Sequence, residues 1–587
     1  MNWDLSNVVK DEKEFEQLFN ESKEKISVLA SYKGKLGNEK DFVDYLLCAK
    51  ETEEKFARAY LYAHLRSDLN KKDMTSAAIF SRIMGLYQLY AQSMSFEGPE
   101  ILALGKDKVM KFIDNNKEIE EFRFKMDKMF HSSDHFLDGK SEEIIAVMSQ
   151  ACGRSRELYS ALSVADGHGE EVELSNGKVT VTQGNWRMLI SNALTQDDRR
   201  KIFEAIFNYY EIHKNTYAAI YEGAVLSNKA NAQNRKYDSI LESYLDPNNI
   251  PTSVYLNLVD VASHYNEGLK KYIKLREKYL GLSRHNTYDR FLELAKSDKK
   301  FNFDEAKELF FASIKNCPQD FQDKAREALR DGYVDVYEKD GKRSGAYSSS
   351  VPGVHPFILL NYNGTLEDVF TVAHESGHSM HTLYSSEAQP TTLQDYTIFV
   401  AEIASTFNEH MLLDYLMNSG KLDKNDKIML LQKAIDEIYA TFYRQTLFAE
   451  YELRINKLAE DDQPINHEVL SKVMIDLYKQ YYDIDITVEK VKQYVWAYIP
   501  HLFYTPFYVY QYATSFSASF KLYKNVLENK EVGFEKYLGL LKAGGSKYPI
   551  DEAKDAGVDF TNKDTFMAVV ERMNDLVNQL EKLLEEK

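Results

Sequence analysis

The sequence predicts a mainly α-helical protein. Only one proline precedes Pro247, and residues 421–532 contain no glycine. Helix interiors exclude proline and disfavour glycine, so such long stretches favour helices. Apolar residues also recur at i, i+3, i+4 and i+7 in three N-terminal segments, as they do in amphipathic helices. These segments are residues 12–32, 41–67 and 75–95.

Two segments interrupt the helical pattern. Residues 171–182 alternate between apolar and polar side chains and contain Asn176-Gly177, which predicts a β-hairpin turning at that pair. Residues 333–362 combine glycine-rich turns with an apolar run, and they predict a small β-sheet inside the helical protein.

The chain has 587 residues, which exceeds one ordinary core at roughly 100–200 residues per domain. Helical periodicity resumes after the predicted hairpin, near residue 190. We therefore predict an N-terminal helical domain over residues 1–190 and a second domain over residues 191–587.

Composition excludes several classes of function. The net charge of −18 disfavours nucleic acid and anionic membranes as partners. The three cysteines lie far apart without a CxxC pair, which disfavours a disulfide framework and a thiolate zinc site. No secretory signal or apolar run of roughly 18–20 residues is visible. We expect a soluble cytoplasmic protein, and its oligomeric state stays open.

One motif indicates a catalytic metal site. It is the H-E-x-x-H sequence formed by His374, Glu375 and His378. On a helix, residues i and i+4 lie on one face a turn apart, so the two imidazoles converge on one metal ion. The glutamate beside them is placed to take a proton from water. A surface helix carrying these residues by chance is the plainer alternative.

A catalytic zinc ion needs a third protein ligand and one open position. His381 and Tyr384 stand where a metzincin would have glycine and histidine, which rules out that class. Among the acids downstream, Glu387 and Asp395 lie in a polar stretch, whereas Glu402 lies in an apolar helical stretch. A carboxylate in apolar surroundings is costly unless it meets a cation, so Glu402 is the expected third ligand.

Three segments together resemble the oligoendopeptidase F family, within the thimet oligopeptidase-like zinc metallopeptidases. They read HESGHSMH, VAEIASTFNE and IPHLFYTPFYVYQYATS, and the resemblance covers roughly residues 200–580. It implies an elongated two-lobed helical shell around a deep channel, with residues 191–587 as the catalytic domain. It also implies one Zn²⁺ ion held by His374, His378 and Glu402, with Glu375 as general base and short peptides as substrates.

In this family a histidine and tyrosines stabilise the oxyanion, and His501, Tyr508 and Tyr512 stand at the matching positions. Where thimet-type relatives have glycines, this sequence has other residues, so Tyr504 and Tyr510 remain alternatives.

The local sequence predicts how two of these tyrosines are presented. Thr505 is expected to cap a helix that begins at Pro506, which would place Tyr508 and Tyr512 one turn apart on one face. A stripe of core aromatic residues is the alternative interpretation.

Further candidates are weaker. His381 follows His374 by seven residues and is either a packed histidine or a substrate contact. Glu409 either orients a metal ligand or lies on a helix surface. The strand at residues 354–362 is predicted to pair with an extended peptide under a loop whose glycines are at 341, 345 and 353, or to be purely structural.

The sequence therefore predicts a zinc endopeptidase that cleaves short peptides, with manganese or cobalt as possible substitutes for zinc. A zinc exopeptidase and a catalytically silent peptide-binding protein on the same scaffold are the alternatives.

Overall fold

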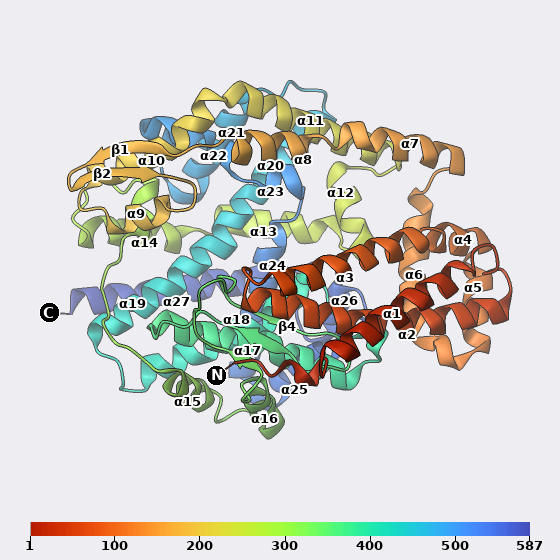
Figure 1. Cartoon of the computed structure of the whole chain (residues 1–587). Helices are drawn as coiled ribbons and strands as arrows, with labels where there is room; N and C mark the ends of the chain where they lie inside the picture. The colour runs from red at the N-terminus through yellow and green to blue at the C-terminus, as the bar shows by residue number, and fades with distance from the viewer. Residues whose placement is uncertain (1, 587) are drawn as a thin grey trace. The chain divides into compact units, whose positions relative to one another are not determined.

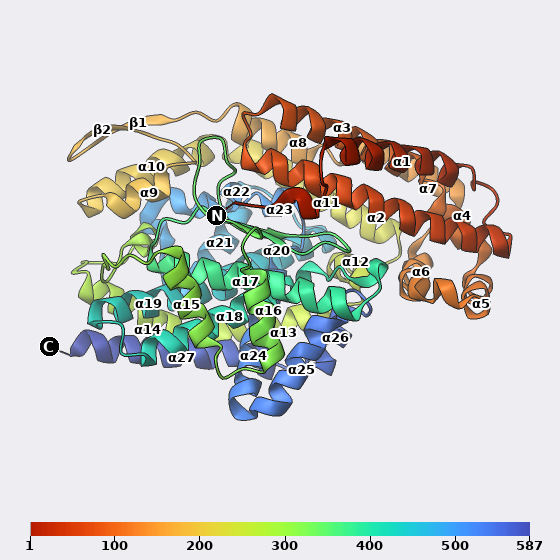
Figure 2. The ribbon, with the colours of Figure 1, turned by 60° about the horizontal axis from the view of Figure 1, so that its bottom comes forward.

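The computed structural model describes residues 2–586. Helices make up most of it, and the strands form two small sheets, which confirms the predicted fold class (Figures 1 and 2). No helix of these residues is long and apolar enough to cross a membrane.

The chain divides into two compact units, each made of three separate segments. Unit 1 comprises Met1–Asp134, Asp298–Ser419 and Leu522–Val558, and unit 2 comprises His135–Ser297, Gly420–Lys521 and Asp559–Lys587. The predicted domains, 1–190 and 191–587, stay predictions.

Unit 1 contains most of the long N-terminal helices and the predicted metal ligands. Its α-helices are α1 (Glu12–Ala30), α2 (Glu39–Leu69), α3 (Met74–Ser93), α4 (Glu97–Leu104), α5 (Lys106–Asn115), α6 (Arg123–His131), α15 (Phe303–Ser313), α16 (Gln319–Ala328), α17 (Leu366–Ala388), α18 (Ile398–Asn418), α25 (Lys530–Ala543) and α26 (Pro549–Asp555).

Unit 2 is also helical. Its α-helices are α7 (Gly139–Cys152), α8 (Ser155–Ser160), α9 (Trp186–Asn192), α10 (Gln196–Ile212), α11 (Lys214–Asn234), α12 (Ile240–Leu245), α13 (Thr252–His264), α14 (Glu267–Tyr279), α19 (Lys424–Ile438), α20 (Arg444–Glu460), α21 (His467–Tyr482), α22 (Val495–Tyr498), α23 (His501–Tyr504) and α27 (Asp564–Glu585). Shorter helical turns used below are η6 (Thr287–Phe291), η8 (Tyr439–Tyr443) and η9 (Ile486–Tyr494), and α24 (Tyr510–Glu528) runs from unit 2 into unit 1.

The three predicted N-terminal helices are α1, α2 and α3, which lie side by side in both views (Figures 1 and 2). Asp11, Asn38 and Asp73 cap their N-termini by accepting backbone N–H groups of the first turn. Their apolar faces form one core that includes Phe15 and Ile83. The apolar periodicity therefore predicted both the helices and the faces that they bury.

The predicted hairpin is present as antiparallel strands β1 (Glu170–Leu174) and β2 (Gly177–Val181). The two residues between the strands are Ser175 and Asn176, so the turn lies one residue earlier than predicted. The carboxylate of Asp198 accepts the N–H of Ser175 at 2.8 Å and its hydroxyl at 2.5 Å. This anchor on α10 fixes the register of the turn.

The second predicted sheet has three strands, β3 (Val334–Asp335), β4 (Tyr347–Ser349) and β5 (Phe357–Leu359). Their order is β3-β5-β4, with β5 parallel to β3 and antiparallel to β4. The prediction that residues 354–362 pair with a peptide is wrong, because β5 is the central strand and its hydrogen-bonding edges are already occupied. The strands with an open edge are β3 and β4.

Candidate metal centre

Helix α17 carries the H-E-x-x-H motif and begins with a capping box. Thr365 accepts the N–H of Asp368, whose carboxylate in turn accepts the N–H of Thr365 at 2.9 Å. The helical spacing brings the Nε2 atoms of His374 and His378 to 3.2 Å from each other. The two imidazoles thus converge on one point, as the i and i+4 spacing predicts.

The neighbouring helix α18 brings Glu402 to the same point. Its Oε2 lies 3.4 Å from Nε2 of His374 and 3.5 Å from Nε2 of His378. Among the described residues, these three form the one group of histidine, cysteine or acidic side chains positioned to hold a metal ion. The other acids considered, Glu387 and Asp395, are not in this group, and Glu387 pairs with Lys324 instead.

The close packing of α17 and α18 depends on Gly377, which lies inside the motif. A Cβ atom at this position would come within 2.5 Å of the Ala404 carbonyl oxygen and of Ser405 Cα. Only glycine allows the α18 backbone to approach so closely, and this approach brings Glu402 within reach of the two histidines. The H-E-x-x-H motif alone does not indicate this role.

Neighbouring side chains orient two of the three candidate ligands, His374 and Glu402. Glu409, also on α18, places its Oε1 at 2.6 Å from Nδ1 of His374. The hydroxyl of Ser405 donates to Oε2 of Glu402 at 2.9 Å. A carboxylate on the far ring nitrogen fixes the tautomer and orientation of a metal-binding histidine. Of the two interpretations of Glu409 from sequence, the structure supports the orienting one, whereas Ser405 was missed.

The charges of the cluster act on one another. Burial lowers the pKa of His374, but the hydrogen bonds that its ring donates to Glu402 and Glu409 outweigh burial and hold that pKa well above its ordinary value. Burial, reinforced by the charge of His374, lowers the pKa of His378 to about 4. Burial raises the pKa of Glu402, but the hydrogen bond with His374 and the charges of both histidines bring it down to about 2. The carboxylates of Glu402 and Glu409 therefore favour the protonated form of His374.

Glu375 differs from the other acids. Its side chain is buried, 6% exposed, and its Oε2 has no hydrogen-bond partner among the described residues. Burial raises its pKa to about 7, with the attraction of His374 opposing this shift and the charges of Glu402 and Glu409 adding to it. A carboxylate with a pKa near neutrality is suited to accept and release a proton.

His381 is a packed residue. It is fully buried, and its ring stacks on Tyr396 with a centroid distance of 3.6 Å and an interplanar angle of 3°. Burial, together with the charge of His378, lowers its pKa to about 3, so the ring is neutral. Of the two interpretations from sequence, the structure supports the packed histidine.

His501, Tyr508 and Tyr512 lie in unit 2, whereas the metal cluster lies in unit 1. Their rings form a group of their own. The His501 ring lies 6.1 Å from that of Tyr508 and 6.3 Å from that of Tyr512, and the two tyrosine rings are 5.5 Å apart. Burial and the charge of Arg444 lower the pKa of His501.

The helix predicted to start at Pro506 is not formed. Helix α24 begins at Tyr510, so Tyr508 precedes it. Phe507 has a φ of +53°, and its N–H donates to the buried carboxylate of Glu452 at 2.7 Å. This contact holds the backbone out of the helical conformation. Tyr510, one of the alternatives, is buried against Tyr255 at a ring distance of 5.0 Å.

Fold and site together define a helical peptidase of the H-E-x-x-H type. Residues 191–572 match the family model described as Peptidase family M3, and residues 100–167 match the model described as Oligopeptidase F. The chain belongs to peptidase family M3, as its three segments suggested, and it is a peptide-hydrolysing metallo-oligopeptidase.

Relatives cover the whole chain. Oligopeptidase PepF of Bacillus subtilis (strain 168) is 33% identical over 99% of this chain and 87% of its own length. An oligoendopeptidase F homolog of Lactococcus lactis subsp. lactis (strain IL1403) is 31% identical over 100% of this chain and 97% of its own. The similarity therefore extends well beyond residues 200–580, to which the sequence motifs pointed.

Solved structures are also similar to almost the whole chain. The crystal structure of oligoendopeptidase-F from Enterococcus faecium has a TM-score of 0.75 and 26% identity, covering 98% of this chain and 100% of that one. A crystal structure from Chlamydophila abortus has a TM-score of 0.91 and 30% identity, covering 99% of this chain and 98% of that one.

Proposed function

We propose that this enzyme is a zinc-dependent endopeptidase that hydrolyses internal bonds of short peptides. The distances between the ligand atoms of the metal cluster are the main support for this proposal. Ligand atoms at roughly 2.0–2.2 Å from a tetrahedral zinc ion lie about 3.3–3.6 Å from one another. The separations of 3.2, 3.4 and 3.5 Å among His374, His378 and Glu402 fit that set.

Two imidazoles and one carboxylate leave a fourth position open, as in catalytic zinc sites. When bound, zinc supplies Lewis-acid polarisation of the scissile carbonyl and of an attacking water. Manganese and cobalt accept the same donor atoms, so they are expected to substitute for zinc.

The proton transfers are assigned to Glu375. Its free carboxylate oxygen accepts a proton from the attacking water and then passes this proton to the leaving amine. Glu409 holds the tautomer of His374 in which Nε2 faces the metal. His501, Tyr508 and Tyr512 are proposed to donate hydrogen bonds to the developing oxyanion.

An extended peptide is proposed to pair with β4 rather than with β5. Strand β4 is an edge strand packed against α17, and the hydroxyls of Ser348 and Ser379 lie 2.8 Å apart at this contact. Backbone pairing along an edge tolerates many side chains, as an enzyme for varied peptides requires.

Internal cleavage is proposed because relatives named oligoendopeptidase F match over most of this chain. A cytoplasmic location is also proposed, on the grounds that all three cysteines are free and one of them, Cys152, is exposed.

The test is cleavage of a quenched-fluorescent mixture of short peptides, with products mapped by mass. We expect internal cuts that stop when a chelator removes the metal and resume when zinc is added back. Release of single terminal residues would make the protein an exopeptidase. Binding of peptides without cleavage by zinc-loaded protein would favour the silent binding protein.

A further inference from the structure

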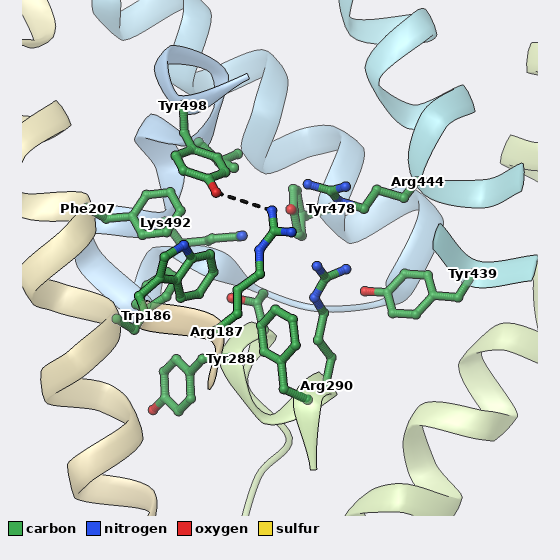
Figure 3. A pocket seen from close by; sticks show the side chains of 14 residues that line it. Trp186, Arg187, Phe207, Tyr288, Arg290, Tyr439, Arg444, Tyr478, Lys492 and Tyr498 are labelled. Atoms are coloured by element: carbon green, nitrogen blue, oxygen red, sulfur yellow. Dashed lines mark hydrogen bonds between the residues drawn. The ribbon is translucent and has the colours of Figure 1, made fainter. Parts of the chain in front are cut away.

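Unit 2 contains a cavity whose lining is cationic and aromatic, and which no step of peptide hydrolysis uses. Its cavity volume is about 20 Å³, which is room for one or two water molecules or for one compact ion. Arg187 of α9, Arg290 of η6, Arg444 of α20 and Lys492 of η9 direct their charged ends into it (Figure 3). We call this cavity the four-cation pocket.

The four-cation pocket has no acidic side chain in its lining. Within the described part of the chain, no carboxylate lies within 4.0 Å of the nitrogens of Arg187, Arg290, Arg444 or Lys492. The hydrogen bond at these groups joins Nη2 of Arg187 to the hydroxyl of Tyr498, at 3.2 Å. Lys492 is buried, and Arg290 and Arg444 are half-buried. Cations withdrawn from solvent normally meet carboxylates, so this excess of positive charge requires an explanation.

Aromatic rings compensate part of the charge. The guanidinium of Arg290 lies 4.5 Å from the ring centre of Phe291, and that of Arg444 lies 4.9 Å from the ring centre of Phe448. The Lys492 ammonium lies 5.3 Å from the ring centre of Tyr478. Such contacts are weaker than a hydrogen-bonded ion pair and leave the N–H groups of the cations unpaired.

Two acids outside the lining act on these cations, the buried Glu489 and the half-buried Asp436, and both already accept hydrogen bonds from other residues. The carboxylate of Glu489 accepts the N–H of Thr287 at 2.9 Å and its hydroxyl at 2.5 Å. The carboxylate of Asp436 accepts the hydroxyl of Tyr272 at 2.7 Å. Burial raises the pKa of both acids, which weakens the neutralisation that they offer.

The cations also repel one another. Burial lowers the pKa of Arg444, and the charge of Arg290 lowers it further. Burial lowers the pKa of Lys492 to about 7, in spite of the attraction of Glu489. A ligand with more than one negative charge would relieve this repulsion.

The shape of the donors favours a phosphate group. Guanidinium forks bind phosphate and carboxylate oxygens in pairs, and three forks converge here with an ammonium group. Tyr439 and Tyr478 add hydroxyls to the lining. One carboxylate offers two oxygens and one charge, whereas a phosphoryl group offers three or four oxygens and up to two charges.

We propose that the four-cation pocket binds a phosphate-class oxyanion, either inorganic phosphate or the phosphoryl group of a small phosphate ester. The lining of the pocket shares no residue with the metal cluster of His374, His378 and Glu402. It gives the peptidase a binding function for a ligand that is not a peptide.

Isothermal titration of the zinc-loaded full-length enzyme in phosphate-free buffer at constant ionic strength tests this. The probes are orthophosphate for the free ion, phenyl phosphate for an ester, and acetate for a carboxylate. We expect saturable binding of orthophosphate or phenyl phosphate at one site and at least tenfold weaker binding of acetate. The stronger of the two phosphates identifies the source of the ligand.

Variants locate the site. We expect Arg444→Gln to weaken phosphate binding at least tenfold. Arg187→Gln changes an exposed side chain, and we expect it to weaken binding to the same extent if the half-buried Arg444→Gln variant fails to fold. Lys457→Gln is the matched control, because this exposed lysine lies on the same helix, α20, outside the pocket, and its binding should match wild type. Phosphate bound at the zinc ion would be unaffected by any of these changes.

Three results would overturn the proposal. The first is no saturable binding of either phosphate at millimolar concentration. The second is equal binding by wild type and by the folded Arg187→Gln and Arg444→Gln variants. The third is acetate binding as tightly as phosphate, which would make the pocket a carboxylate site.

Discussion

Gly377→Ala is predicted to destroy the metal site by separating two helices. The added Cβ would lie 2.5 Å from the Ala404 carbonyl oxygen and from Ser405 Cα, which are backbone atoms that cannot rotate away. Restoring contacts of about 3.5 Å requires α17 and α18 to separate by roughly 1 Å. Metal sites tolerate ligand shifts of only about 0.2 Å, so Glu402 would no longer share one ion with the histidines.

The energetic cost follows from the same contact. Overpacking typically lowers the free energy of unfolding by about 1–3 kcal/mol. The higher helix propensity of alanine over glycine offsets about 1 kcal/mol of this loss. Urea unfolding of the apo protein measures the stability, and zinc titration with a competing chelator measures the affinity. We expect zinc affinity to fall at least a hundredfold. Expressed as a free energy, this loss should exceed the loss in the free energy of unfolding.

Gly539→Ala is the matched control for this substitution. Gly539 lies inside helix α25 of the same unit, and a Cβ at this position would meet nothing within 4 Å. Its replacement should stabilise the protein slightly and leave zinc affinity unchanged. If Gly377→Ala behaves like this control, close packing of α17 and α18 does not determine the metal site.

Three further changes separate the roles around the cluster. Glu409→Gln should lower zinc affinity about 10–100-fold with the fold intact, because it removes the carboxylate that orients His374. Unchanged zinc affinity in a chelator competition would contradict this prediction. His381→Phe should keep full zinc content and activity, since the neutral ring only packs on Tyr396, and loss of zinc by elemental analysis would disprove packing as its role. Zinc affinity should rise with pH through the neutral range, because the raised pKa of His374 means that a proton must leave before the metal binds. Zinc titrations at several pH values that show a flat or falling affinity would refute this prediction.

Local patterns predicted the parts of the site that local geometry determines. The i and i+4 spacing of His374 and His378 was sufficient to place both imidazoles, and the apolar neighbours of Glu402 indicated a carboxylate that needs a cation. The packing distance between two helices, by contrast, depends on both helices and cannot be inferred from the sequence of either one alone. For this reason the role of Gly377 could not be predicted. The contact of Ser405 with Glu402, three residues apart on one helix, is local and was simply missed.

The sequence-based errors have the same origin. A helix starting at Pro506 is locally reasonable, but a hydrogen bond from Phe507 to Glu452, 55 residues away, overrides it. The apolar run of β5 indicated a buried strand, yet only the order of strands shows that this strand is central. Apolar periodicity, which depends on neighbours within one helix, correctly predicted α1, α2 and α3.

The central claim is that Glu375 moves the proton while His374, His378 and Glu402 hold zinc. Peptide hydrolysis by Glu375→Gln, measured on protein with the same zinc content as wild type, tests this claim most directly. The account predicts bound peptide and intact zinc with turnover reduced at least a hundredfold, since a general base contributes about 10²–10⁴-fold. Turnover at the wild-type rate by the zinc-loaded variant would contradict it.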